Sequence, residues 1–531
     1  MKGIYLAGNF HKTEKAIKTI SPSNGEIIDE VSLAGEGEIE RALGAAWEGI
    51  GKEIPRRLFS RLREVLSRRA EEVAQLIAME QGKPVTEALA AEIYPSLSYI
   101  AFLEEKGEEF IRDKDMPPEE PMFSGRRGRL IMEPTRITLV ISPWNYPFAI
   151  PFLDIVASIF ASSPVLFRPS SMTPLVGLKI AELFQEAGFP PFSLQVLITT
   201  HGDAERIIRD PRVSTVMFTG SLEVGKKIGT IAGEELKRAV LELGGKDAMV
   251  VFEDANLERA VNGALWAGFM NAGQTCASVE RLIIHHEIAS SFLETLKEKV
   301  DKLRVGDPLE DGVDMGPMVS ENQREKVLSM LKGGEVIAGG KPIEGKGFFM
   351  QPTLVYEPPE DSPVWQEEVF GPVISIKTFK TEEEALHLAN NNKYGLTASV
   401  WTKDRERARR ISEKLEAGVV TVNDHLSSYA EPSAPWGGVK GSGLGRSHGS
   451  FALQGVLQPK YIMEDFSKRK KLLWWFPYGE KNIRIMLLAS RMLYGKGKLK
   501  ALMELFPYLG RLLKEVGLSS LVSSLGRLIG L

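Results

Sequence analysis

One cysteine and one glutamate lie in surroundings that would let both do chemistry. Cys276 is the only cysteine among 531 residues, and it follows the small and polar residues 271–275, which would let a substrate approach the thiol. Glu242 precedes it by 34 residues, between Leu241 and Leu243. A thiol is a nucleophile, and apolar neighbours raise the pKa of a carboxyl group toward that of a general base. The alternatives are a buried structural cysteine and a structural salt bridge.

Asn145 is a third candidate, in a turn imposed by Pro143 and Pro147 directly after the apolar segment 137–141. A fixed side-chain amide there could stabilise an oxyanion, with a backbone N–H as the second donor. Asparagine is also common in ordinary turns, so this signal is weak by itself.

A possible phosphate site follows the apolar segment 213–218. Gly220 and Ser221 lie between this segment and a helical pattern that includes Leu222, Ile228 and Ile231. The free N–H groups at the start of such a helix suit a pyrophosphate. The segment lacks the GxGxxG pattern, and a plain strand-to-helix turn would look similar.

The elements that must position these residues follow an α/β pattern. Residues 39–112 have helical apolar spacing, whereas from residue 137 short β-branched runs alternate with helix-length segments. This alternation predicts a parallel sheet covered on both faces. A second α/β unit is expected at about 245–440. The predicted strands after residue 137 are residues 137–141, 165–167, 194–198, 213–218, 239–243 and 249–252.

Residues 137–167 are the most apolar stretch, and a membrane-spanning helix is one interpretation of them. Pro143, Pro147 and Pro151 would each remove a helical hydrogen bond, and Asp154 would bury a carboxyl group. A buried strand, a turn and a buried helix therefore fit better.

Composition excludes several classes of protein. The chain is 43% hydrophobic and 26% charged, with 66 basic and 70 acidic residues, which is typical of a globular protein and argues against a nucleic-acid partner. A single cysteine excludes an internal disulfide. The first residues lack the apolar core of a signal peptide, so a cytoplasmic location is expected.

Six motifs in order resemble the aldehyde dehydrogenase superfamily, over residues 21–462. They are SPWNYPF (142–148), FTGSLEVG (218–225), LELGGK (241–246), NAGQTC (271–276), EEVFGPV (367–373) and PWGGVKGSGLGR (435–446). The resemblance implies an α/β fold with two Rossmann-like parallel-sheet domains, a β-ribbon oligomerisation element and a helical C-terminal extension. It implies a dinucleotide-binding domain at 1–116 and 136–244, a catalytic domain at 245–435, a ribbon at 117–135 and 436–465, and a basic amphipathic extension at 466–531.

The resemblance also implies a reaction, the NAD(P)-dependent oxidation of an aldehyde to a carboxylic acid. The Cys276 thiolate would attack the aldehyde to give a thiohemiacetal, held by the Asn145 amide and the Cys276 N–H, and hydride transfer would leave a thioester. Water activated by Glu242 would hydrolyse it. No metal is expected. The implied NAD or NADP site consists of Ile141, Pro143, Trp144, Arg168, Ser171, Gly202, Gly220, Ser221, Leu243, Glu368 and Phe370.

Two positions depart from the family pattern. The family often has Lys-Pro-Ser-Glu where the adenosine ribose binds, and this chain has Arg168-Pro169-Ser170-Ser171. Loss of that carboxylate and gain of an arginine predict that NADP is accepted. Asp154 stands where many members have a lysine, so assistance from that lysine is not expected here.

The extension, residues 466–531, has 13 basic and 3 acidic side chains, with Trp474, Trp475 and Tyr478 beside a basic cluster. This pattern predicts contact with a membrane surface; packing on the body or on a second subunit is the alternative. The extension resembles those in the branch that includes carotenoid-dialdehyde dehydrogenases, which implies a long apolar aldehyde. The family also implies a homodimer or homotetramer.

Three other activities remain to be weighed against this one. A CoA-acylating dehydrogenase would not need the base Glu242. A catalytically lapsed, membrane-associated scaffold would not need to keep Cys276, Glu242 and Asn145 together. An esterase side reaction needs only the activated thiol. The sequence does not identify the aldehyde.

Overall fold

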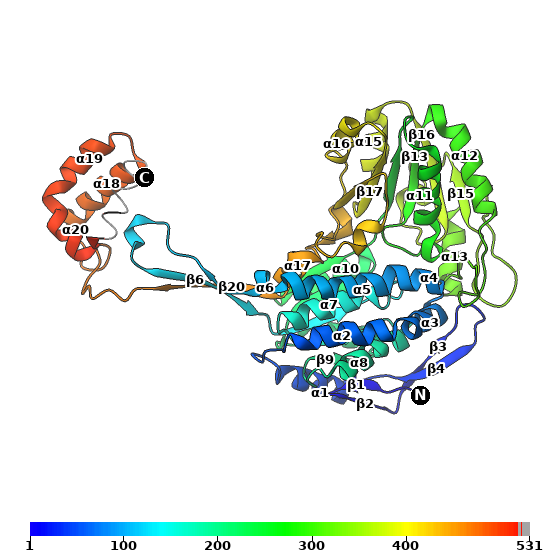
Figure 1. Cartoon of the computed structure of the whole chain (residues 1–531), viewed down its shortest axis with the longest axis horizontal. Helices are drawn as coiled ribbons and strands as arrows, with labels where there is room; N and C mark the ends of the chain where they lie inside the picture. The colour runs from blue at the N-terminus through cyan, green and yellow to red at the C-terminus, as the bar shows by residue number, and fades with distance from the viewer. Residues whose placement is uncertain (519–521, 523–531) are drawn as a thin grey trace. The chain divides into compact units, whose positions relative to one another are not determined.

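The chain forms two compact units in the computed structural model, which describes residues 1–518 and 522. The first unit contains Met1–Phe110 and Pro134–Leu457, and the second contains Ile111–Glu133 and Gln458–Leu531 (Figure 1). The last part of the extension predicted at 466–531 therefore lies outside the described residues.

The first sheet of the first unit has eight strands in the order β19-β11-β10-β7-β8-β9-β1-β2. The five strands from β11 to β9 are parallel, as the sequence predicts. Every residue of β7 and of β8 is buried, because helices cover both faces of the sheet. The strands are β1 (Ile4–Leu6), β2 (Asn9–His11), β7 (Ile137–Ile141), β8 (Val165–Arg168), β9 (Leu194–Val196), β10 (Val213–Thr219), β11 (Arg238–Glu242) and β19 (Gly443–Leu444).

Helix α7 (Ala149–Phe160) shows which of the two interpretations of the apolar stretch at 137–167 is right. All but one of its residues are buried inside the unit, so the stretch is a strand, a turn and a core helix, as expected. No helix among the described residues is both long and apolar enough to cross a membrane. The other helices around this sheet are α1 (Glu36–Trp47), α2 (Arg57–Arg68), α3 (Ala70–Gln81), α4 (Val85–Ala88), α5 (Tyr94–Phe102), α6 (Glu108–Ile111), α8 (Pro174–Ala187), α9 (His201–Arg209), α10 (Leu222–Glu234) and α17 (Gly449–Gly455).

The second sheet has seven strands in the order β14-β15-β16-β13-β12-β17-β18, all parallel except β14. Two apolar clusters pack on it, one on each face. Its strands are β12 (Asp247–Val251), β13 (Val279–His285), β14 (Glu335–Ala338), β15 (Thr353–Tyr356), β16 (Val373–Phe379), β17 (Thr397–Trp401) and β18 (Val419–Val422). Its helices are α11 (Leu257–Phe269), α12 (His286–Asp301), α13 (Glu321–Met330), α14 (Pro363–Gln366), α15 (Glu382–Asn390) and α16 (Arg405–Ser412). A separate hairpin joins β3 (Ala16–Ile20) and β4 (Ile27–Ser32).

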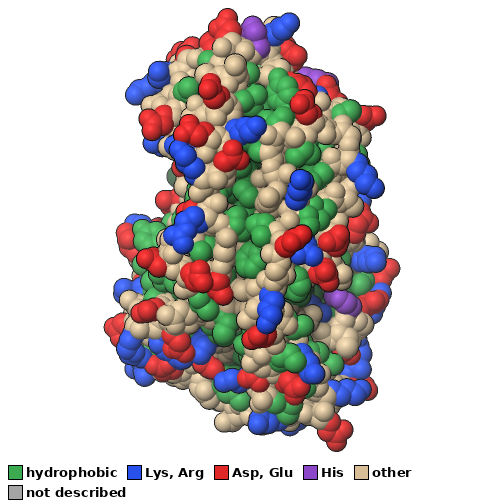
Figure 2. Space-filling model, turned by 90° about the vertical axis from the view of Figure 1, so that its right-hand side faces the viewer, with side chains coloured by type: hydrophobic (Ala, Val, Ile, Leu, Met, Phe, Trp, Pro, Cys, Tyr) green, Lys and Arg blue, Asp and Glu red, His purple; other side chains and the backbone are tan. Residues whose placement is uncertain are grey.

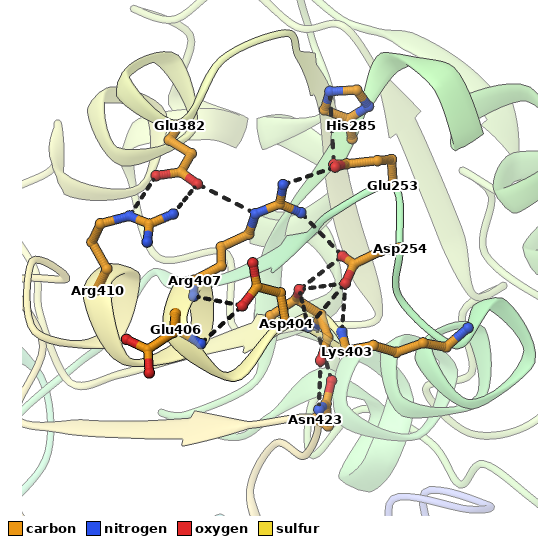
Figure 3. A network of polar contacts seen from close by, with 11 residues as sticks. Glu253, Asp254, His285, Glu382, Lys403, Asp404, Glu406, Arg407, Arg410 and Asn423 are labelled. Atoms are coloured by element: carbon orange, nitrogen blue, oxygen red, sulfur yellow. Dashed lines mark hydrogen bonds and ion pairs between the residues drawn. The ribbon is translucent and has the colours of Figure 1, made fainter.

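An ion-pair network lies at the carboxyl end of β12, an interior strand of this second sheet. Arg407 of α16 reaches Glu253 and Asp254, which follow β12, and also Glu382 of α15 (Figure 3). Asp404 caps α16 by accepting hydrogen bonds from two of its first backbone N–H groups. The chain just before β12 packs against the backbone of Cys276, so the network stabilises the opposite end of this strand from the thiol.

The surface of the first unit carries both signs of charge. On the face drawn in Figure 2, acidic and basic side chains are interspersed around hydrophobic ones, without a large area of one sign. A face on which acidic and basic side chains are mixed in this way does not attract a polyanion strongly.

The second unit combines a small sheet with a helical cluster. β5 (Lys114–Asp115), β6 (Arg127–Pro134) and β20 (Leu457–Glu464) pair in the order β20-β6-β5. Helices α18 (Glu480–Tyr494), α19 (Lys498–Leu505) and α20 (Leu509–Glu515) share one apolar cluster.

The ribbon differs from its expected range of 436–465. Residues 443–455 belong to the first unit, because β19 adds to the first sheet beside β11. Only the residues after 457 join the second unit.

Candidate active site

Three cavities meet at Cys276. The loop cavity, about 190 Å³, lies among the turns that follow β7, β10 and β11. The aromatic cavity, about 100 Å³, is lined mainly by apolar side chains, and the carboxyl cavity, about 30 Å³, contains Glu242. One sulfur atom thus borders three chemically different spaces. Their common lining residue, Cys276, is partly exposed.

The backbone before Cys276 is held in an unusual conformation. Asn271, Ala272 and Gly273 have φ values of 56°, 52° and 66°, three successive residues in the left-handed region. The backbone of Gly273 approaches Gly371 so closely that a Cβ would lie 2.0 Å from the Gly371 carbonyl oxygen. Strained conformations of this kind persist where the surrounding structure enforces them, often at functional sites. The two loops therefore fix each other and the thiol between them.

The environment of the Cys276 thiol favours its neutral form. Burial raises the pKa of Cys276, and the carboxyl groups of Glu368, Asp247 and Glu242 raise it further. The Ala277 backbone N–H opposes this rise. A buried thiol among carboxyl groups needs a proton acceptor before it becomes a strong nucleophile.

Glu242 is the last residue of β11, and its side chain enters the carboxyl cavity beside Cys276. Its two carboxyl oxygens are buried and make no hydrogen bond among the described residues. Burial raises the pKa of Glu242 well above its ordinary value, Asp154 raises it further, and Arg446 opposes the shift. The carboxyl group therefore has the raised pKa of a general acid–base group.

Asp154 and His448 share the carboxyl cavity with Glu242. Burial raises the pKa of Asp154 to about 7. Burial also lowers the pKa of His448 to about 3, so its imidazole is neutral, and its Nε2 has no hydrogen-bond partner among the described residues. Asp154 is thus a second titratable carboxyl group close to Glu242.

Asn145 is buried in the turn between β7 and α7. Its Nδ2 donates to the backbone carbonyl of Gln274, 3.0 Å away, which orients the amide beside Cys276. An amide nitrogen carries two hydrogens, so a second donor remains. The Asn145 backbone carbonyl accepts from Asn271 Nδ2 at 2.9 Å and from Lys83 Nζ at 2.7 Å.

A buried ion pair holds the turn that carries Asn145. Lys83 Nζ lies 2.7 Å from Glu92, and the ammonium group also lies 3.7 Å from the centre of the Tyr146 ring. Glu92 in turn accepts from the backbone N–H groups of Phe148 and Ala149 at 2.8 and 3.0 Å. Lys83 and Glu92 therefore bind both sides of the turn.

The loop cavity brings together most of the positions predicted to bind a dinucleotide. Helix α10 begins beside it, with Ser221 as the capping residue. The cavity thus offers a helix N-terminus for a pyrophosphate, which fits the predicted group. Its lining includes the predicted residues Pro143, Trp144, Gly220, Ser221, Leu243, Glu368 and Phe370, together with Asn145, Thr219, Gly244, Gln323, Lys326 and Cys276.

Glu368 and Phe370 are held by a second buried ion pair. Glu280 accepts from the backbone N–H groups of Val369 and Phe370 and pairs with Lys246 Nζ at 2.6 Å. Glu368 accepts from the Gly245 N–H at 3.0 Å, and burial raises its pKa to about 8. In addition, the ring of Phe370 packs edge-on against Trp144. Both acidic and aromatic groups are therefore fixed at the mouth of the cavity.

Four predicted cofactor residues do not line the loop cavity: Ile141, Arg168, Ser171 and Gly202. Ile141 and Arg168 are paired at the carboxyl ends of β7 and β8. Arg168 donates to the hydroxyl and carbonyl oxygens of Thr199, each at 3.1 Å. Arg168 is thereby linked to the start of α9, which contains Gly202.

The aromatic cavity has a wall of large rings. Tyr146, Trp266, Tyr429 and Trp436 line it, along with Ile150, Met270, Leu426 and alanines. None of its lining residues has a charged side chain. It suits an apolar group that approaches the thiol.

Comparison with known proteins decides the family. The model of the aldehyde dehydrogenase family matches residues 10–462. The chain belongs to the aldehyde dehydrogenase family. This aldehyde dehydrogenase is 33% identical to aminoaldehyde dehydrogenase 1, peroxisomal, of Pisum sativum, with 84% of this chain and 92% of that protein covered. It is 36% identical to succinate-semialdehyde dehydrogenase, mitochondrial, of Arabidopsis thaliana, over 84% of this chain and 86% of the relative.

Solved structures agree with this assignment. An NADP-dependent enzyme of E. coli is 32% identical, with a TM-score of 0.83, and covers 87% of this chain and 98% of its own. The NAD+ complex of an aldehyde dehydrogenase from Bacillus cereus is 30% identical, with a TM-score of 0.84, over 88% and 97% of the two chains. This aldehyde dehydrogenase oxidises an aldehyde to a carboxylic acid with NAD(P), and its two parallel-sheet domains confirm the expected α/β fold.

Sequence reasoning missed the two buried ion pairs of this aldehyde dehydrogenase. Lys83 lies in Gln81-Gly82-Lys83-Pro84, and Glu280 lies between Val279 and Arg281. A signal was present, since an unpaired charge is rarely buried, and charged residues inside apolar segments therefore call for partners. Glu280 and its partner Lys246 are 34 residues apart, and no local pattern links Lys83 with Glu92, so both pairings emerge only from the fold.

Proposed function

We propose that Cys276 is the nucleophile of this dehydrogenase, Glu242 its general base and Asn145 a donor to the oxyanion. The observation that carries the proposal is that Cys276 borders all three cavities. Each cavity supplies one requirement of the reaction: a place for the cofactor, a place for the substrate and a base.

In the first step, Glu242 takes the thiol proton and the Cys276 sulfur bonds to the aldehyde carbon. The carbonyl oxygen becomes an alkoxide, which the free N–H of the Asn145 amide and the Cys276 backbone N–H stabilise. NAD(P), when bound, accepts the hydride that this thiohemiacetal loses. A thioester on Cys276 remains.

Before the second step, the proton that Glu242 took from the thiol passes to solvent. Glu242 then takes a proton from water, whose oxygen attacks the thioester carbon. The C–S bond breaks, the Cys276 sulfur takes up the proton held by Glu242, and the acid is released. The raised pKa of Glu242 supports this role, because a base of that strength removes a proton from water more readily than an ordinary carboxylate. Without a general base, the thioester would persist.

The residues that would hold the cofactor are those of the loop cavity, with the start of α10 for the pyrophosphate and Glu368 for the nicotinamide ribose. Arg168, at the carboxyl end of β8, and the absence of a carboxylate at Ser171 support acceptance of a 2′-phosphate. Burial lowers the pKa of Arg168, and the nearby carboxyl group of Asp203 opposes this shift and so favours the charged guanidinium. NADP is therefore accepted along with NAD. Comparing kcat/KM for the two cofactors tests this, and Ser171→Glu should shift the ratio toward NAD.

The substrate that the aromatic cavity fits best is an apolar aldehyde, because the lining carries no charge. A long apolar chain is our first candidate. The names of the plant relatives and the four rings favour a second candidate, a cationic aminoaldehyde held by cation–π contacts. A panel of linear aldehydes of graded length, with one aminoaldehyde of matched length, separates the two.

Two variants test the catalytic roles. Cys276→Ala should abolish aldehyde-dependent NAD(P)H formation. Glu242→Gln should lose both the single-turnover burst of NAD(P)H and steady-state turnover, because Glu242 takes the thiol proton before hydride transfer. A burst retained in Glu242→Gln would show that another group takes the thiol proton and that Glu242 acts only in hydrolysis. Product analysis with added CoA distinguishes hydrolysis from acyl transfer, and release of free acid supports hydrolysis.

The assembly is proposed to be a homodimer or homotetramer. The sheet of the second unit supports this, because β20 is an edge strand that is largely exposed and could pair with a second copy. Light scattering of the full chain tests it, and a monomer at all concentrations would contradict it.

The extension is proposed to bring this enzyme to the cytoplasmic surface of a membrane. Its positive charge and exposed Trp475, Phe476 and Tyr478 support this. Co-sedimentation of the full chain with phosphatidylglycerol vesicles tests the proposal, with phosphatidylcholine vesicles as the control.

A further inference from the structure

Helix α18 has two apolar faces. Ile485, Leu488 and Met492 are buried in the cluster that α18 shares with α19 and α20. The side chains of Ile483 and Leu487 lie on the other side and are 59% and 54% exposed. Helices of globular proteins usually place polar residues opposite their buried face. In the part of the chain that the structure describes, the second apolar face of α18 is therefore left largely uncovered.

This second face borders an apolar groove within the helical cluster. The groove has a volume of about 410 Å³ and continues over Leu502 of α19 and Leu509 of α20. Ser490 and Tyr494 are its only polar side chains among the described residues. A volume of this size is typical of sites for small molecules, and an apolar lining of this kind offers no hydrogen bonds to a polar ligand. The groove suits a hydrocarbon chain.

The charge around the groove identifies the kind of hydrocarbon. Residues 466–518 contain 12 basic and 3 acidic side chains. Arg484 and Arg491 directly follow two residues of α18 that line the groove, Ile483 and Ser490, and therefore flank the groove. The aliphatic part of an arginine can lie along an apolar surface while its charged end reaches the solvent. Cations beside an apolar groove are complementary to a phospholipid with an anionic headgroup.

We infer that the groove between α18, α19 and α20 holds an acyl chain of an anionic membrane phospholipid. The inference rests on the proposed membrane association and adds a defined lipid site to it. The family match ends at residue 462, so the groove, apart from Met122, lies in the part of the chain that the family does not explain. The phosphate is held by the flanking arginines, and the acyl chain lies along Leu487.

Photo-crosslinking tests the site directly. The full-length enzyme is irradiated with phosphatidylglycerol vesicles that contain a phospholipid with a diazirine in its acyl chain, and labelled peptides are identified by mass spectrometry. We expect the label on peptides of α18, α19 and α20. A label confined to other segments, or the absence of any label on α18, α19 and α20, overturns the inference.

A matched pair of variants separates this groove from general adsorption. Leu487→Ser removes an exposed groove residue, and Leu499→Ser removes one that is 69% exposed on α19 outside the groove. Leu487→Ser should weaken vesicle binding about tenfold, whereas Leu499→Ser should leave it nearly unchanged. If the two variants weaken vesicle binding equally, the lipid site in the groove is wrong, although membrane association stands. If the parent enzyme does not bind the vesicles, both the lipid site and the membrane association are wrong. Aldehyde oxidation in the absence of vesicles should be unchanged in both variants, which checks that the enzyme is folded.

Discussion

Lys83 and Glu92 form an ion pair 2.7 Å apart in which neither side chain is exposed to solvent. Lys83 precedes α4 and Glu92 follows it, and both side chains bind the backbone of the turn that carries Asn145. Burying two charges costs free energy that the pair recovers only through its further hydrogen bonds to this turn. The turn is thus held in place by two charged residues that lie 62 and 56 positions from their partners in the turn and outside any predicted site.

We expect Lys83→Met to lower the free energy of unfolding by about 3 to 5 kcal/mol, because Glu92 would be left buried and unpaired. It should also lower kcat by about 10²-fold, since displacing an oxyanion donor by a small distance is costly. Chemical denaturation and steady-state kinetics measure the two effects. Lys302→Met, which breaks an exposed pair with Glu298, is the control and should change neither.

The double variant Lys83→Met with Glu92→Gln separates positioning from stability. Removing both charges should restore much of the free energy of unfolding, while kcat stays low because the turn has lost its ammonium contact. If kcat returned together with stability, Lys83 would have a structural role only.

Asp154→Asn should move the acidic limb of the kcat profile to lower pH. Glu242 acts as a base only when ionised, and the negative charge of Asp154 raises the pKa of Glu242. Removing that charge lowers the pKa, so Glu242 ionises at lower pH. Arg446, the other charged group that faces Glu242, is unchanged. A pH profile of the variant measures the shift, and Asp301→Asn, an exposed change on α12, should leave the limb in place.

Gly273→Ala should inactivate the enzyme and destabilise it by about 1 to 3 kcal/mol. The backbone at Gly273 has positive φ, and a Cβ would collide with the Gly371 carbonyl, so the loops around Cys276 must separate. Gly233→Ala, in open space on α10, should instead stabilise by up to about 1 kcal/mol. Thermal unfolding of both variants measures this contrast, and an active Gly273→Ala enzyme would contradict the proposed rigidity.

Arg407→Ala should lower the free energy of unfolding by about 1 to 3 kcal/mol without changing kcat. The variant removes the cation that joins three carboxylates at the carboxyl end of β12 (Figure 3). Arg409→Ala changes an exposed neighbour on the same helix and should shift stability by less than about 0.5 kcal/mol. A loss of kcat in Arg407→Ala would show that this end of β12 is coupled to the active site.

Much of the first sheet could be predicted because its signals are local. Short β-branched runs such as 137–141 and 213–218 form strands, and Pro143 and Pro147 force the turn at Asn145. The ribbon range was harder to predict, because the affiliation of residues 443–455 depends on pairing between β19 and the distant β11. Pairing of remote strands leaves no local pattern.

The sequence alone determined the chemical groups, their order and the family, since a lone cysteine, a glutamate in an apolar segment and six ordered motifs are properties of the chain itself. Only the tertiary structure decided how these groups meet. Lys83 meets Glu92 and Asn145, Glu280 meets the backbone beside Glu368, and Asp154 shares a cavity with Glu242. The physical reason is that burial and electrostatic coupling depend on distances in space. Residues far apart in the sequence acquire those distances only when the chain folds.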